Sequence, residues 1–235
     1  MQNIKKIEEI SLTFYEKLSE DSWHARKDQS LSFMRSFVEN FNFPTIECIE
    51  TGASQDLKDG CFGILLAKMC FETGGIFSSV DLSSSISSKS SDLYNEIFPD
   101  FPVNHYVGDS IEFLKKYEGC PNLIHLDSWD LDLKNPVPSM LHGWLEFDAI
   151  RDKMPSGSIC LVDDNYIKGS WVSWNWLDPN LNVVSTESKV IDITYDIIGK
   201  GSLIYHWAQK EETDWDLIGD HYHPGKNIKL ILKKR

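Results

Sequence analysis

The sequence predicts an α/β fold in which a doubly wound, mostly parallel sheet carries helices on both faces. Two observations lead to this prediction. From residue 44 onward, short apolar runs alternate with helix-like stretches, which is the pattern of βαβ units. Each of the first five runs also ends in an acidic residue. Because ligands bind outside the carboxyl ends of parallel strands, these acids predict a site at one edge of the sheet.

The predicted strands and helices follow one another in strict alternation. The strands cover residues 45–50, 75–82, 103–109, 122–127 and 158–163, and the helices cover 62–72, 84–98, 110–118 and 140–154. The later runs 189–198, 201–208 and 228–234 come without clear helices between them. We therefore expect antiparallel strands added at one edge of the sheet.

The first forty residues have a helical pattern, with Ile4, Ile7 and Ile10 at near-helical spacing and Pro44 closing the segment. We expect one domain over residues 1–235, composed of a helical extension (1–43) and an α/β core (44–235). The extension is a candidate lid over the site or a homodimer contact.

Composition narrows the function classes. With 41% hydrophobic residues, no long apolar span and a charged N-terminus, the chain is expected to be a cytoplasmic protein without a membrane partner. A formal net charge of −13 repels phosphate backbones, which argues against a nucleic-acid partner. The five cysteines are scattered and form no CxxC pair, which argues against a disulfide framework or a structural zinc site.

The acidic strand ends carry the functional prediction. One aspartate at a strand end is well explained as a turn residue, but five strands in succession strain that explanation. Asp81 ends the second strand, where a nucleotide-binding fold places the carboxylate that binds the ribose hydroxyls. No GxGxxG fingerprint is present, which favours a nucleoside ligand over a dinucleotide.

Three segments, "IECIETGAS", "SVDLS" and "VGDSIEFLKK", resemble the motifs of class I S-adenosylmethionine-dependent methyltransferases, whose fold is Rossmann-like. The resemblance spans about residues 45–165. It implies that S-adenosyl-L-methionine is bound by residues at the strand ends, namely Glu50, Thr51, Gly52, Ala53, Asp81, Leu82, Gly108, Asp109, Ser110 and Asp127. The first motif departs from the usual short glycine loop, because "GASQDLKDGCFG" replaces it.

A narrower resemblance concerns "HLDSWD" and "LVDDNY", which are similar to the metal-binding segments of metal-dependent O-methyltransferases of the catechol and macrocin types. By position, this resemblance implies that Asp127, Asp164 and Asn165 hold Mg²⁺ or another divalent cation. Carboxylate and amide oxygens are suitable ligands for Mg²⁺. A cation there would help a bound hydroxyl lose its proton. Asp163 is expected to support these ligands without binding the ion itself.

Two residues are candidates for the general base. The catechol enzymes have a lysine three residues after the strand-four aspartate, and here that position is Asp130. His142 lies in a Pro-x-Pro-Ser-x-x-His stretch that resembles a group of bacterial methyltransferase-like proteins. An unperturbed imidazole titrates near neutrality, so His142 is the other candidate, beside Asp127 in the catalytic set.

Several of these residues also have a purely structural interpretation. Asp164 and Asn165 suit a β-turn, Asp81 suits a helix N-cap that Ser83 or Ser84 could provide instead, and His142 suits a hydrogen-bonded position at the core edge.

Two further clusters stay ambiguous. His221 and His223 have metal-like spacing but no third ligand nearby, so we expect a loop. The tryptophans of "SWVSWNWLDP" (170–179), at partly helical spacing, belong either to the core or to a site rim against which a sugar or aryl acceptor stacks.

The predicted function is methyl transfer from S-adenosylmethionine to a hydroxyl of a sugar, a glycan precursor or another small hydroxylated molecule, assisted by Mg²⁺. Two alternatives remain: a nucleoside-binding module without transfer chemistry, and a metal-dependent hydrolase or hydroxylase that uses the same rim.

Overall fold

The computed structural model describes residues 9, 13, 33, 34, 36, 37, 39–54, 61–169, 171–177, 183–190, 196–210, 212–221 and 228–235. Their main feature is a sheet with the strand order β3-β2-β1-β4-β5-β10-β9. Its strands are β1 (Glu47–Thr51), β2 (Ile76–Asp81), β3 (Val103–Val107), β4 (Leu123–Leu126), β5 (Ile159–Ile167), β9 (Trp215–His221) and β10 (Ile228–Lys234). The first five pair in parallel, and β10 is antiparallel to both β5 and β9. The predicted fold class is confirmed.

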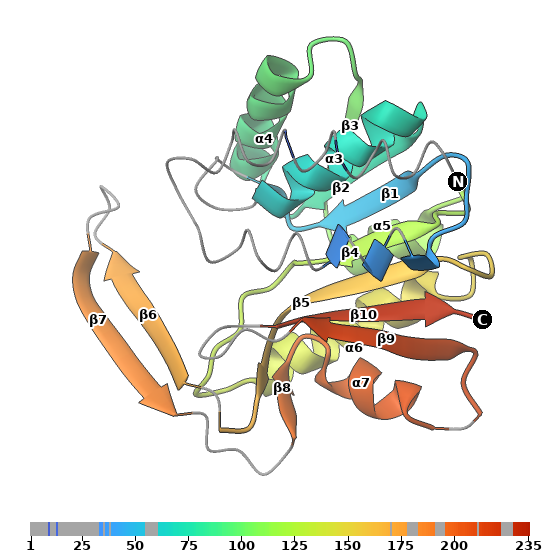
Figure 1. The fold of residues 1–235 in the computed structure, drawn as a ribbon. Coiled ribbons are helices and arrows are strands. Elements are labelled where there is room, and N and C mark those ends of the chain that lie inside the picture. The colour runs from blue at the N-terminus through green and yellow to red at the C-terminus, as the bar shows by residue number, and fades with distance from the viewer. Residues whose placement is uncertain are drawn as a thin grey trace.

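Helices cover both faces of this sheet (Figure 1). They are α3 (Cys61–Thr73) and α4 (Ser84–Ile97) on one face, and α5 (Ser110–Lys116), α6 (Val137–Ile150) and α7 (Ser202–Ala208) on the other. Successive strand residues point to opposite faces. Accordingly, Cys48 of β1 joins the buried cluster under α3, and its neighbour Ile49 joins the cluster under α6.

One prediction in the C-terminal part is wrong. Residues 201–208 were expected to form a strand, but α7 occupies Ser202–Ala208. Ile204, Trp207 and Ala208 pack on the same apolar cluster, and their spacing of three and four residues is helical. The tryptophan segment, in contrast, is extended: β6 (Trp171–Leu177) pairs with β7 (Val183–Val190) in a separate two-stranded sheet. That sheet projects from the body of the molecule (Figure 1).

Other predictions about the chain ends are tested only in part. The expected strand 189–198 is divided between the end of β7 and the short β8 (Ile197–Gly199), which pairs with the end of β5. Most of the helical extension 1–43 lies outside the described residues, although residues 33, 34, 36, 37, 39 and 40 are helical. The division into extension and core stays a prediction.

The strand order creates a switch point between β1 and β4. The chain moves outward from β1 to β2 and β3 and then returns to β4 on the other side of β1. In doubly wound sheets the ligand crevice opens at the carboxyl ends of such strands. Gly52, which follows β1 with φ 83°, allows a close approach there, because a Cβ atom at this position would lie 2.5 Å from the carbonyl oxygen of Asp127.

Strand β5 contains a bulge at its acidic residues, in the middle of the strand. Val162 pairs with Leu230 and Asn165 pairs with Ile228, so Asp163 and Asp164 together face Lys229. Asp164 has φ 51°, a left-handed conformation that is uncommon outside glycine. A bulge redirects side chains at a sheet edge. It explains why two consecutive residues of one strand both line the same pocket.

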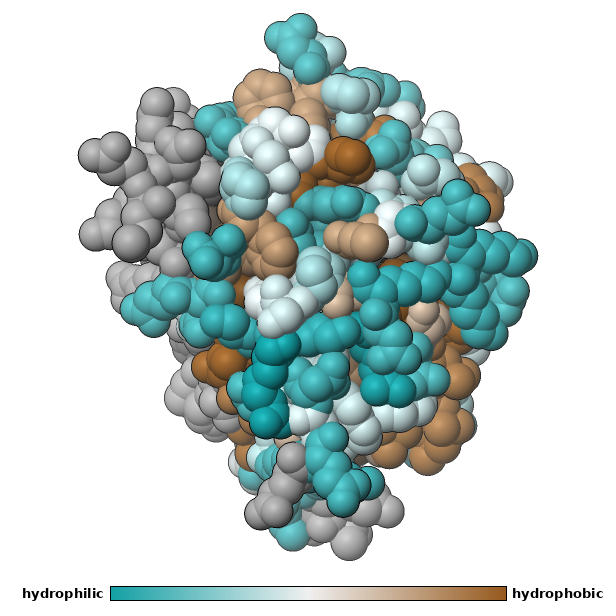
Figure 2. Space-filling view, turned by 90° about the vertical axis from the view of Figure 1, so that its right-hand side faces the viewer, coloured by the Kyte–Doolittle hydropathy of each residue, from teal (hydrophilic) through white to brown (hydrophobic). Residues whose placement is uncertain are grey.

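Hydrophilic side chains cover much of the face on which the C-terminus lies, opposite the carboxyl ends of the parallel strands (Figure 2). Of the helices described, none has the combination of length and apolar character that crossing a membrane requires.

Candidate functional site

A pocket of about 470 Å³ opens at the switch point. This volume suits a small organic ligand, since such sites typically measure about 300–1,000 Å³. Residues in or just after the carboxyl-terminal parts of the five parallel strands line most of it, namely Gly52, Ala53 and Ser54, Asp81 and Leu82, Gly108, Asp109 and Ser110, Asp127, Ser128, Trp129 and Asp130, and Asp163 and Asp164. His142 of α6 and the apolar side chains of Val80 and Ile86 complete the lining.

Eight of the ten residues expected to contact the cofactor line this pocket, and Glu50 and Thr51 do not. Both are fully buried behind it. The backbone oxygen of Thr51 accepts a hydrogen bond of 3.0 Å from the Asp127 N–H, so Thr51 positions the end of β4. Neither residue is thus part of the pocket lining, and their contact with the cofactor stays a prediction.

The carboxylate of Asp81 organises the part of the pocket at the ends of β1 and β2. One oxygen accepts a hydrogen bond from the Ala53 N–H (3.0 Å) and the other from the Ser83 N–H (2.7 Å). Ser83 is the N-cap of α4, since its hydroxyl accepts from the Ile86 N–H. Asp81 is thus not needed as the cap. It joins the loops after β1 and β2, and it faces the pocket.

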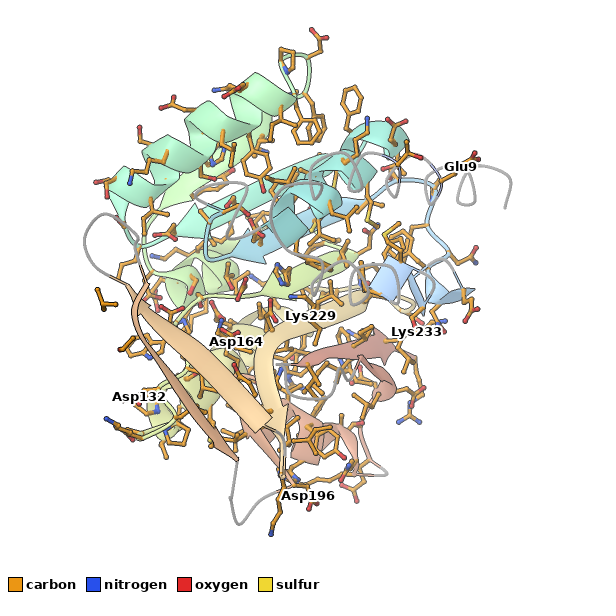
Figure 3. The ribbon with its side chains drawn as sticks, turned by 60° about the vertical axis from the view of Figure 1, so that its left-hand side comes forward. Glu9, Asp132, Asp164, Asp196, Lys229 and Lys233 are labelled. Atoms are coloured by element: carbon orange, nitrogen blue, oxygen red, sulfur yellow. The ribbon has the colours of Figure 1, made fainter. Side chains whose placement is uncertain are left out.

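A chain of buried ionisable groups lies beneath the pocket. His125 Nδ1 is 3.3 Å from Glu50 Oε1, and His125 Nε2 is 3.8 Å from Asp163 Oδ2. Lys229 contacts the Asp163 carboxylate and lies over the ring of Phe62, 4.4 Å from its centroid. Figure 3 labels Asp164 and Lys229, which lie on the paired strands β5 and β10.

Burial and charge set the protonation of these groups. Burial raises the pKa of Glu50, against the effect of His125. Burial lowers the pKa of His125, but the neighbouring Asp163 and Glu50 carboxylates outweigh it and raise this pKa above its usual value. For Asp163 burial is likewise outweighed, because Lys229 and His125 hold the pKa of that carboxyl well below its usual range. A charged Asp163 therefore lies between the Lys229 ammonium and the His125 imidazole.

A second buried lysine bridges two of the expected metal ligands. Lys200 Nζ lies 2.8 Å from Asp127 Oδ1 and 3.0 Å from Asp164 Oδ2, and its side chain is 1% exposed. Burial lowers the pKa of Lys200, but the Asp127 and Asp164 carboxylates raise it above its usual value. The lysine is accordingly charged at neutral pH.

As folded, these residues do not fit the expected Mg²⁺ site. The Asn165 amide oxygen accepts a 2.6 Å hydrogen bond from the Gly201 N–H, and its nitrogen donates to the backbone oxygens of Val162, Asp163 and Ile228. The expected Asn165 ligand is thus used in holding the backbone. A divalent ion within about 4 Å of the Lys200 ammonium would be repelled by roughly 8 kcal/mol at an effective dielectric constant of about 20.

Another group of potential ligand atoms lies nearby. Atoms of His125, Asp127 and Asp163 come within 4.8 Å of one another. Each carboxylate of this group also pairs with a lysine: Asp127 with Lys200, and Asp163 with Lys229. This second group is therefore no better suited to a divalent cation than the first.

The candidate base His142 belongs to a hydrogen-bonded cluster. Its Nε2 lies 2.9 Å from the Ser128 Oγ and 3.2 Å from the Ser110 Oγ. Ser128 donates its proton to Glu146 Oε1 at 2.6 Å, so its oxygen can accept a hydrogen bond from the His142 Nε2–H. In that tautomer Nδ1 carries the lone pair that would take a proton. Glu146, four residues along α6, is fully buried.

The aromatic residue beside this cluster is Trp129. Its ring centroid lies 5.2 Å from that of His142, its side chain is 57% exposed, and its φ of 61° is uncommon for a bulky residue. Asp130, the rival base, follows it on the pocket rim. His223 and the side chains of Trp171, Trp174, Trp176 and His221 lie outside what the structure describes.

Sequence reasoning missed four contributors: Lys200, Lys229, Glu146 and Trp129. A lysine between two glycines (199–201) marks a close backbone approach, and Glu146 is four residues after His142 on a predicted helix. Both features can be recognised in the sequence. Lys229 is far from Asp163 in sequence, and no local pattern predicts their pairing.

Comparison with known proteins agrees with this geometry. Neither a protein-family model nor a curated protein matches the sequence. Solved structures do match its fold. An O-methyltransferase from Bacillus cereus in complex with SAH has a TM-score of 0.55 at 10% identity, over 100% of this chain and 91% of the other.

Two further examples each have a TM-score of 0.53. One is an S-adenosylmethionine-dependent methyltransferase from Clostridium acetobutylicum, at 11% identity over 88% of this chain and 91% of the other. The second is a protein described as a putative rRNA methylase from Clostridium thermocellum, at 9% identity over 88% and 96%. At such identities the likeness establishes the fold alone. The chain has the class I S-adenosylmethionine-dependent methyltransferase fold.

Proposed function

We propose that this protein binds S-adenosylmethionine in the switch-point pocket and transfers its methyl group to a hydroxyl oxygen of a small acceptor. The observation that carries the proposal is one pocket lined by two sets of residues. Asp81 and Gly52 come from the ends of β2 and β1, and Ser128 and His142 come from the segment after β4 and from α6. A cofactor and an acceptor could therefore be held next to one another.

The cofactor half has the chemistry that a nucleoside needs. The carboxylate of Asp81 would accept hydrogen bonds from the ribose hydroxyls, and Leu82 and Ile86 offer apolar surface next to it. Asp109 is occupied in part as the N-cap of α5, where its side chain accepts from the Glu112 N–H. The backbone around Gly108 and Ser110 would border the base.

The acceptor half supplies a route for the proton. When bound, S-adenosylmethionine supplies a methyl group on a positively charged sulfur, and its transfer to a hydroxyl oxygen leaves one proton to be removed. His142 Nδ1 would take that proton, and Ser128 and Glu146 would hold the ring in place. Asp130 on the rim is the competing base.

The acceptor is best described as a neutral hydroxylated molecule, such as a sugar or glycan precursor. Trp129 offers an exposed aromatic face, on which a sugar ring packs well. Six aspartates line the pocket, and no lysine or arginine is found among the described lining residues. Hydroxyl groups donate to carboxylates, whereas a phosphate group would be repelled. For the same reason we propose no nucleic-acid partner.

Mg²⁺ assistance, which the resemblance implied, is not part of this proposal, because Lys200 bridges Asp127 and Asp164. A nucleoside-binding module without transfer chemistry remains the second candidate. It is favoured by the unusual loop sequence after Gly52, of which residues 55–60 lie outside the described part of the chain.

Transfer of a labelled methyl group tests the proposal. Labelled S-adenosylmethionine is incubated with the protein and with monosaccharides, methyl glycosides, inositol, catechol, alkylamines or RNA. We expect label only in the hydroxylated acceptors, and less of it with Asp81→Asn. Label in amines or RNA would overturn the acceptor class. Binding of S-adenosylhomocysteine without transfer to any acceptor would favour the second candidate.

A further inference from the structure

The segment Gly199–Gly201 places one lysine at the point where a metal-dependent site would need its cation. Lys200 Nζ is within 3.0 Å of a carboxylate oxygen of both Asp127 and Asp164. Those two side chains are 28% and 26% exposed and line the pocket, whereas the lysine approaches them from the buried side. The ammonium thus lies behind the two carboxylates that line the pocket.

Close backbone packing specifies this position. Gly199 has φ 132°, and a Cβ atom there would lie 2.0 Å from the carbonyl oxygen of Asp164. A Cβ atom on Gly143 of α6 would lie 2.4 Å from the carbonyl oxygen of Lys200. The Asn165 amide also fixes Gly201 from β5. The lysine backbone is therefore held from both sides, and its side chain has a defined direction.

We propose that the Lys200 ammonium is the permanent cation of this site, in place of a divalent metal ion. This inference rests on the proposed function, because the acceptor belongs to that function. The contacts of Lys200 with Asp127 and Asp164 do not depend on it. Lys200 is then a positioning residue: it offsets the repulsion between Asp127 and Asp164 and fixes their carboxylates toward the acceptor. The acceptor would bind by donating hydrogen bonds to those carboxylates and not by chelation to a metal.

Charge accounts for the difference from a metal site. Two carboxylates and one ammonium leave one net negative charge, whereas a divalent ion would leave none. A residual negative charge favours a cofactor with a positively charged sulfur, and it disfavours an acceptor that binds as an anion. Such an acceptor would need the metal that Lys200 replaces.

Titration with Mn²⁺, followed by its electron paramagnetic resonance signal, tests the inference without any turnover. We expect no binding to the wild-type protein at millimolar Mn²⁺. Lys200→Ala removes the ammonium and should bind one Mn²⁺ at least about tenfold more tightly than the wild type. Adding Asp127→Asn to that variant should remove the site. The Tm of Lys200→Ala should rise with Mn²⁺, whereas that of the wild type should not.

Two results would overturn the inference. One is a wild-type protein that binds one Mn²⁺ at micromolar concentration and loses it in Asp127→Asn. The other is a folded Lys200→Ala protein that binds no Mn²⁺. If Lys200→Ala does not fold, the wild-type titration still decides. Failure of the proposed function would appear separately, as absence of S-adenosylhomocysteine binding.

Discussion

Lys229 contacts the carboxylate of Asp163 across the β5–β10 bulge, and both side chains are buried. This ion pair joins the antiparallel C-terminal strand to the acidic strand end that lines the pocket. Its partners extend to His125 and Glu50. The geometry of the pocket floor therefore depends on a residue 66 positions away in the chain.

Removal of one partner of this pair should destabilise the fold. Lys229→Met leaves the buried Asp163 charge without its main counter-ion, and such changes cost about 3–5 kcal/mol. Urea unfolding gives the free energy. The double variant Lys229→Met/Asp163→Asn should lose less than the sum of the two single variants. Strict additivity would mean that the pair is not energetically coupled.

Stability should fall as pH rises above about 6.5, because folding raises the pKa of His125. A group whose pKa is higher in the folded state contributes its full stabilisation below its unfolded pKa. That contribution is lost as pH rises through the folded pKa. Urea unfolding between pH 6 and pH 9 measures this slope. His125→Gln should flatten it, and an unchanged slope in this variant would assign the effect to other groups.

Asp81→Asn should weaken binding of S-adenosylhomocysteine by about 1–3 kcal/mol, the range for loss of hydrogen bonds to a charged group. Isothermal titration calorimetry measures the change. Asp100→Asn, at an exposed turn after α4, is the matched control and should bind as the wild type does. Equal affinities for all three proteins would remove Asp81 from the ribose site.

The two candidate bases can be separated kinetically. We expect His142→Gln to lower kcat by about 10²–10⁴-fold, the usual contribution of a general base, with little change in S-adenosylhomocysteine affinity. Asp130→Asn should alter kcat much less. If the two effects were reversed, Asp130 would be the base, and the Ser128–His142–Glu146 cluster would be structural.

Trp129→Ala should raise the acceptor KM by about 2- to 12-fold, since aromatic contacts contribute about 0.5–1.5 kcal/mol. Binding of S-adenosylhomocysteine should stay unchanged. Leu141→Ala provides a control, because this exposed side chain of α6 does not line the pocket. A KM that stays constant in Trp129→Ala would place the acceptor elsewhere.

Local sequence patterns predicted the sheet and most of the pocket. The acidic strand ends at Asp81, Asp109, Asp127 and Asp164 come together because parallel strands end at one edge. The metal ligands Asp127, Asp164 and Asn165 were instead implied by resemblance to metal-dependent O-methyltransferases. That resemblance did not include Lys200, the cation that faces two of them, because this lysine comes from a distant segment next to α7, whose residues were predicted as a strand.

Long-range packing accounts for the rest. Glu50 looked like a strand-end ligand, yet Gly63 of α3 packs so closely on its carboxylate that a Cβ atom there would lie 2.0 Å from Oε1. The bulge at Asp164 depends on pairing with β10, which no pattern around residue 164 indicates. Residues positioned by their neighbours in sequence were predictable, and those positioned by β10 or α7 were not.

Calorimetric titration of the wild-type protein with S-adenosylhomocysteine, in the presence of EDTA, tests the central claim most directly. We propose that Asp81 binds the cofactor in this pocket and that Lys200 supplies the cation beside it. We therefore predict binding of one molecule per chain, with the same affinity after excess Mg²⁺ replaces EDTA. Absence of binding under both conditions would contradict the proposed function.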